Sequence, residues 1–388
     1  MEMKRLFFLC CLAVLVPGCG SNGLSRSELE SLVPGPTPNR VVSLELKAVL
    51  KDIPADGREL RLWMPLLQSD AHQAVSECRI VSPLRPMVRY DPVFGNTMMY
   101  FTGDEPLPAS LTTSMSFRVE LHRCPPADVV GTVPLAPEAL KDLSFYLDTT
   151  HREEGLKQAL NILAERITRE REQDRPMLEA ERDRLTVVYN RLSQGNASLR
   201  EVTAGLADSK LSPLQQTRRV YDFVREKLAL ADTDVSSDRT LFEAWQSARV
   251  TPLEYARITV FLLRTLGIPA RVEYGVVLSE PGQSAESSDQ VRAHVWVGAY
   301  VSPGFWFSVD PVLAETQPDL TDYYFGTDCA SRIRFGWGSD INLAPQQIGE
   351  PLPIFFEPRP EVDDKILPVE FSVTMKDLVA QSPKETKK

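Results

Sequence analysis

The hydrophobic pattern of this chain changes from strand-like to helical and back to strand-like, and this order constrains the fold most strongly. Between Val42 and Leu50, apolar side chains alternate with Ser43, Glu45 and Lys47, which predicts a half-buried β-strand. Similar patterns recur at residues 59–64, 97–102 and 116–122, with turn residues between them. Short strands with turns at this spacing predict a β-sandwich over residues 40–126.

Helical periodicity replaces the strand pattern after about Ala136. Apolar residues recur at helical spacing within residues 155–172 and again within 179–192. Pro176 lies between these segments and would interrupt one continuous helix, so a helical hairpin is expected. We assign it to a helical linker or insertion over residues 127–210.

Two later segments begin with the same helix-start signal. Residues 212–215 read Ser-Pro-Leu-Gln and residues 251–254 read Thr-Pro-Leu-Glu, each a capping box with proline at the first helical position. The helices are expected to reach about Leu230 and Leu266. Strand patterns follow at residues 271–278, 291–300 and 305–309. This order predicts an α+β core over residues 211–347, followed by a C-terminal extension over 348–388.

The first residues have the features of an export signal. Lys4 and Arg5 precede an apolar run over residues 6–16, which is too short for a bilayer span of about 20 residues. The run ends in Val16-Pro17-Gly18-Cys19, which resembles the lipobox of bacterial lipoproteins. This resemblance implies a signal peptide over 1–18, lipid on Cys19 and a lipidated linker over 19–39. The protein would then be exported and anchored in the bacterial cell envelope, on the periplasmic or cell-surface side. Pro17 is unusual there, so unlipidated secretion and an uncleaved anchor remain alternatives.

An exported chain is able to form disulfides. Cys78 and Cys124 fall within the predicted sandwich and are the candidate pair, and the alternative is that both are small buried residues. Cys329 is expected to follow all the core strands.

Charge and residue spacing exclude several classes of protein. The chain has 43 Lys and Arg against 53 Asp and Glu, a net charge of −10, and no basic block, which disfavours nucleic acid as a partner. Its six cysteines and four histidines show no Cys-x-x-Cys or His-x-x-x-His spacing, so we expect no metal and no other cofactor.

Three motifs in the predicted core resemble those of transglutaminase-like domains. They are Arg264-Thr265-Leu266-Gly267-Ile268-Pro269-Ala270-Arg271, His294-Val295-Trp296-Val297, and Trp306-Phe307-Ser308-Val309-Asp310-Pro311. The resemblance extends from about residue 40 to 365. It implies a papain-like core, with helices packed on an antiparallel sheet and a triad of Cys, His and Asp. His294 would be the general base and Asp310 the residue that orients it.

The nucleophile position departs from the family pattern. The family's cysteine lies three residues before an aromatic residue, here Tyr255, and that position holds Pro252. Thr251 offers a neighbouring hydroxyl, but its capping box would commit that hydroxyl to the helix backbone. Thr251, Tyr255 and Trp296 are expected to line the cleft. His294 and Asp310 are expected to meet, either as a vestigial general base and its orienter or as a structural hydrogen bond between strands.

These features predict a membrane-anchored, noncatalytic lipoprotein that binds or scaffolds a peptide or protein in the cell envelope. The first alternative is an active amide-processing enzyme, working by acyl transfer or peptide hydrolysis with a non-standard nucleophile. The second is a purely structural envelope component. The missing thiol favours binding over catalysis.

Overall fold

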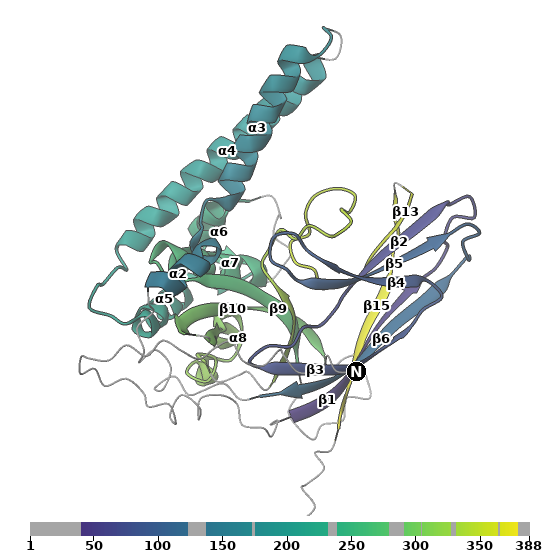
Figure 1. Cartoon of the computed structure of the whole chain (residues 1–388). Coiled ribbons are helices and arrows are strands. Elements are labelled where there is room, and N and C mark those ends of the chain that lie inside the picture. Colours follow the sequence, from purple (N-terminus) through teal and green to yellow (C-terminus); the bar gives the residue numbers. More distant parts are fainter. Residues whose placement is uncertain are drawn as a thin grey trace, which may run out of the picture.

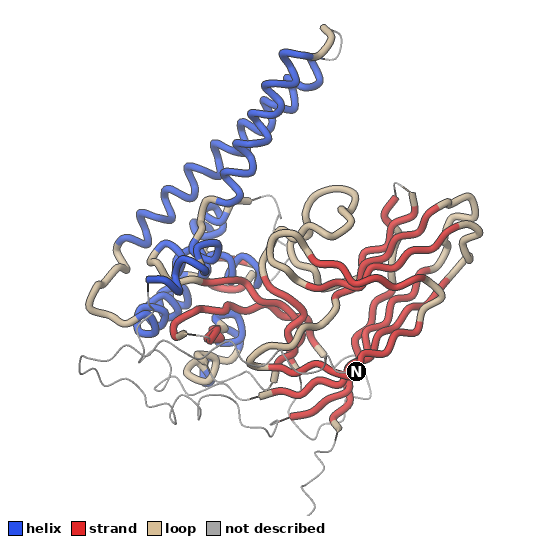
Figure 2. Tube along the Cα trace, in the orientation of Figure 1, coloured by secondary structure: helices blue, strands red, loops and turns tan. Residues whose placement is uncertain are grey.

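The computed structural model describes residues 40–122, 137–172, 175–231, 239–278, 291–303, 305–326, 331–363 and 365–378. They form an α+β fold, as predicted, in which a β-sandwich lies beside a sheet that helices cover (Figure 1). The helices and most of the strands occupy separate regions of the molecule (Figure 2). Among these residues, no helix is both long and apolar enough to cross a membrane.

The β-sandwich consists of two sheets with strand orders β15-β1-β6-β3 and β14-β13-β2-β5-β4. Its N-terminal strands are β1 Arg40–Leu50, β2 Glu59–Pro65, β3 Gln73–Val81, β4 Arg85–Tyr90, β5 Thr97–Asp104 and β6 Leu111–Leu121. The alternation predicted on β1 is confirmed, because every second residue from Val42 to Leu50 is fully buried. β3 and β4 are edge strands whose side chains are mostly exposed. Neither has the alternation of buried apolar and exposed polar residues from which a strand can be predicted.

The C-terminal segment returns to the sandwich. β15 Glu370–Asp377 pairs antiparallel with β1, and β13 Arg359–Val362 pairs with β2 and with β14 Lys365–Ile366. Arg40 Nε donates a hydrogen bond to Asp377 Oδ1 at 2.8 Å. Without these strands β1 and β2 would be sheet edges with unpaired backbone groups. Residues from both ends of the described chain therefore build one sandwich.

A second antiparallel sheet, the core sheet, has the order β11-β10-β9-β12. Its strands are β9 Ala270–Val277, β10 Arg292–Ser302, β11 Phe305–Val309 and β12 Arg332–Trp337. The first three lie within two residues of their predicted bounds. The expectation that Cys329 follows all core strands is wrong, because β12 comes after it. The arginines of β12 are buried, so the alternation of charged and apolar residues on this strand does not mark a solvent-exposed face.

Helices and short strands surround this sheet. α7 Pro252–Thr265 buries eight of its 14 residues and packs on β9 and β10. The remaining elements are α2 Pro137–Asp142, η1 Ser144–Leu147, α5 Pro213–Lys227, β7 Ala229–Leu230, α6 Leu241–Ser247, β8 Arg249–Val250, α8 Pro311–Thr316 and η3 Pro318–Leu320. β7 and β8 pair in parallel and position the start of α7.

The predicted helical hairpin is formed by α3 His151–Arg169 and α4 Arg175–Ala204, and it projects from the body of the protein (Figure 1). Pro176 is the second residue of α4, where its missing N–H breaks no helical hydrogen bond. The C-terminal half of α4 packs on α6 and α7, which ties the hairpin to the core.

Candidate functional site

The N-terminus of α7 is the position where the family resemblance places a nucleophile. Thr251 is the N-cap, and its hydroxyl accepts a hydrogen bond from the Glu254 N–H at 3.2 Å. The Glu254 carboxylate accepts in return from the Thr251 N–H at 2.8 Å. Pro252 is the first helical residue and is exposed. The predicted capping box is therefore confirmed, and it occupies the only hydroxyl at this position.

Arg239 binds the carboxylate of the capping box. Its Nε donates to Glu254 Oε1 at 2.6 Å, and its Nη2 donates to the carbonyl of Arg249 at 2.7 Å. Burial alone would raise the pKa of Glu254, but Arg239 and the Thr251 hydrogen bonds outweigh burial and hold that pKa below its usual value. A negative charge at this position also interacts favourably with the helix dipole.

We expect Thr251→Ala to lower the free energy of unfolding by about 1 kcal/mol, because the Glu254 N–H loses its acceptor. Urea unfolding followed by circular dichroism measures this change. Thr251→Ser keeps the hydroxyl and should retain most of the stability. Equal stability of Thr251→Ala and the unchanged protein would contradict the capping role.

β10 and β11 bring the predicted histidine and aspartate together. His294 lies on β10, and Asp310 follows the last residue of β11. The antiparallel register pairs Val297 with Val309, which places Asp310 beside this part of β10 and diagonal to His294. His294 Nε2 lies 2.7 Å from Asp310 Oδ2, so the predicted contact is confirmed.

Asp310 is fully buried and is held from three directions. Besides His294, the Arg332 guanidinium lies 3.2 Å from Oδ2, and the Leu313 N–H donates to Oδ1 at 2.9 Å. Burial alone would raise the pKa of Asp310. The interactions with His294 and Arg332, together with the hydrogen bond from the Leu313 N–H, outweigh that effect and hold its pKa below the usual range. Asp310 is therefore a carboxylate that orients the imidazole and also caps α8.

Two of the residues expected to line the cleft are buried. Tyr255 is completely enclosed, and its hydroxyl donates to the Val224 carbonyl at 3.3 Å. Trp296 is 3% exposed, and its Nε1 donates to Glu273 Oε2 at 2.8 Å. Both rings are therefore packed inside the protein and do not line an open cleft. Of the three predicted lining residues, only Thr251 is partly accessible.

The cysteines add little to the described part of the site. Cys78 lies exposed on β3 and is a free thiol. Cys78 is therefore neither disulfide-bonded nor the small buried residue of the alternative, so both expectations are wrong for this cysteine. Cys19, Cys124 and Cys329 lie outside the described residues, so lipid attachment stays a prediction. Residues 40–378, where described, contain no cluster of His, Cys, Asp and Glu suited to a metal ion.

Sequence reasoning did not find Arg332 as a partner of Asp310. Its Nη1 also donates to Ser308 Oγ at 2.9 Å, so it fixes the end of β11 as well. Arg332 and Arg334 alternate with Ile333 and Phe335, which is a usable strand signal, but no local pattern names Asp310 as the partner of Arg332.

A capped helix start, followed by antiparallel strands that join a histidine to an aspartate, is the arrangement of papain-type cores. Residues 200–311 match the family model described as the Transglutaminase-like superfamily, and this range includes Pro252, His294 and Asp310. The chain therefore contains a transglutaminase-like domain.

Among solved structures, bacterial proteins also match this chain. One is described as a "putative cysteine protease" from Cytophaga hutchinsonii, with 9% identity, 87% of this chain and 98% of that chain covered, and a TM-score of 0.45. Another is the periplasmic domain of TgpA from Pseudomonas aeruginosa bound to ethylmercury, with 14% identity, 78% and 100% covered, and a TM-score of 0.33. No curated protein matches the sequence significantly.

Proposed function

We propose that this protein is a noncatalytic transglutaminase-like protein that binds a peptide or protein partner in the cell envelope. The observation that carries this proposal is Pro252 at the start of α7, where the family has its thiol. Proline offers neither a nucleophile nor a backbone N–H. The adjacent Thr251 hydroxyl already accepts the Glu254 N–H, so it is not poised for attack.

The rest of the site is suited to recognition. Asp310 engages Nε2 of His294, which leaves Nδ1 as the ring nitrogen able to exchange a hydrogen bond with a bound chain. The His294 side chain is 9% exposed, and Pro252 beside Thr251 forms an exposed helix start. A peptide amide could therefore bond to a fixed imidazole without being cleaved.

Activity assays on the purified protein test this function. A fluorescent primary amine and a glutamine-containing peptide measure acyl transfer, and a quenched peptide measures hydrolysis. We expect neither reaction in the unchanged protein. Turnover that His294→Ala abolishes would instead support the alternative, an active amide-processing enzyme with a non-standard nucleophile. Cys329→Ser belongs in the same series, because Cys329 lies three positions before Arg332, a partner of Asp310.

We further propose that lipid on Cys19 anchors the protein to a membrane of the envelope, since the Val16–Cys19 sequence and the short apolar run before it support a lipobox. Mass spectrometry of the detergent-extracted protein should show an N-terminal Cys19 with added acyl mass. Cys19→Ala should release the protein into the soluble fraction. An unmodified N-terminus at another residue would contradict lipidation.

A further inference from the structure

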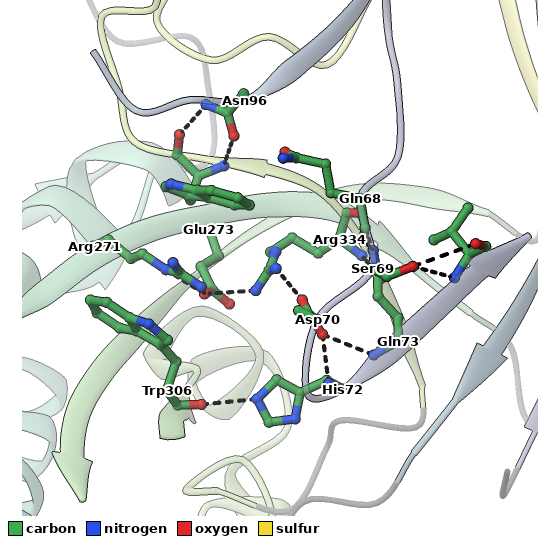
Figure 3. A network of polar contacts seen from close by, with 12 residues as sticks. Gln68, Ser69, Asp70, His72, Gln73, Asn96, Arg271, Glu273, Trp306 and Arg334 are labelled. Carbon is green, nitrogen blue, oxygen red and sulfur yellow. Dashed lines mark hydrogen bonds and ion pairs between the residues drawn. The ribbon is translucent and has the colours of Figure 1, made fainter. Parts of the chain in front are cut away.

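A buried group of charged and aromatic side chains occupies the contact between the core sheet and the sandwich (Figure 3). Its centre is Glu273 on β9, which is 4% exposed. Glu273 accepts from Arg271 Nε at 2.8 Å, from Arg334 Nη1 at 3.2 Å and from Trp296 Nε1 at 2.8 Å. A Cβ at Gly298 would lie 2.7 Å from Glu273 Oε1, so the glycine leaves room for this carboxylate.

Two cations face this one carboxylate, and the sandwich supplies the second anion. Asp70, in the loop before β3, forms an ion pair with Arg334. The neighbouring Gln73 side chain bonds the Arg334 backbone twice, accepting from its N–H at 2.8 Å and donating to its carbonyl at 2.9 Å. The Arg271 guanidinium lies 4.0 Å from the Trp306 ring centroid. Buried charges are stable only when they are paired in this way, so the network requires the sandwich loop.

The same network reaches the histidine of the candidate site through Trp296. The indole is fixed at Nε1 by Glu273, and its ring stacks with His294 at a centroid distance of 6.1 Å and an interplanar angle of 16°. The Arg332 guanidinium lies 5.1 Å from the Trp296 ring centroid and pairs with Asp310. Trp296 therefore contacts His294 and also Arg332, and both of these residues interact with Asp310.

We propose that Asp70, Glu273 and Trp296 are positioning residues for His294, so that docking of the sandwich on the core sheet sets the orientation and hydrogen bonding of the imidazole. This role rests on the proposed function only in treating His294 as part of a binding site. Asp70 belongs to the sandwich and not to the core sheet. It acts on the site through its ion pair with Arg334, which in turn donates to Glu273. The sandwich is then part of the site and not a separate module beside it.

The test is NMR of the ligand-free full chain labelled with ¹⁵N-histidine, which contains only His72, His122, His151 and His294. The unchanged protein should show the Nε2–H tautomer of His294 and a downfield proton from its hydrogen bond to Asp310. Trp296→Phe keeps a ring but cannot bond to Glu273, and Asp70→Asn keeps a hydrogen-bonding oxygen but removes the charge. In each we expect loss or broadening of the downfield proton and appearance of the second tautomer, with the exposed His151 unchanged.

Asp104→Asn, at the exposed end of β5, is the matched control for a surface charge removed from the sandwich. Unchanged His294 signals in both folded variants would overturn the positioning role, as would equal changes in Asp104→Asn. If either variant fails to fold, the other still decides the question. Because the spectra need no partner and no substrate, turnover in the activity assays would overturn the proposed function alone.

Discussion

A Pro252→Cys variant is expected to gain amine incorporation or peptide cleavage that the unchanged protein lacks. The new thiol would sit at the first helical position of α7, where unpaired N–H groups and the helix dipole lower a thiol's pKa. Asp310 already holds Nε2 of His294, which leaves Nδ1 to accept the thiol proton. The substitution therefore adds the one chemical group that the site lacks.

Two further variants separate catalysis from a nonspecific thiol effect. Pro252→Ala restores the backbone N–H without a thiol and should stay inactive. Adding His294→Ala to Pro252→Cys should reduce turnover by about 10²–10⁴-fold, the usual contribution of a general base. A folded Pro252→Cys variant that iodoacetamide alkylates at position 252 but that turns over no substrate would show that the site has lost more than its nucleophile.

Local sequence patterns predicted most of the core correctly, and two features show why. Thr251 caps α7 because Thr-Pro-Leu-Glu satisfies the helix N–H groups within four residues of sequence. The His294–Asp310 contact follows from two neighbouring strands and a short connection between them. Both features depend on residues that lie close together along the chain, so a single sequence is enough to predict them.

What the sequence did not predict depends on partners distant along the chain. β13 and β15 complete a sandwich that begins about 300 residues earlier, and no local pattern names their partners β2 and β1. Glu273 and Arg334 look like ordinary surface charges until Asp70 and Gln73 of the sandwich cover them. A charged residue on a strand is usually exposed, so burial of this network could not be expected from residue type.

Glu273→Gln is expected to lower the free energy of unfolding at pH 7 by about 3–5 kcal/mol, because removing one member of a buried ion pair leaves charges without compensation. Arg271, which is 5% exposed, would lose its ion pair with Glu273, and Arg334, which is 7% exposed, would keep its ion pair with Asp70. Urea unfolding measures the difference. Glu226→Gln, on an exposed residue of α5, is the matched control and should leave stability unchanged.

The cost of Glu273→Gln should also depend on pH, in a direction fixed by the folded-state pKa. Burial alone would raise the pKa of Glu273, but Arg271 and Arg334 lower it to about 2. A carboxyl whose folded pKa lies below its unfolded value of about 4.3 stabilises the fold above that unfolded value and loses this contribution as pH falls toward 2. The stability difference between the two proteins should therefore shrink as the pH falls from 5 to 2. Asp310, whose pKa is also lowered, adds a pH dependence of the same sign to both proteins, so it cancels in the difference. A difference that stays constant down to pH 2 would show that the carboxylate charge of Glu273 does not hold this network together.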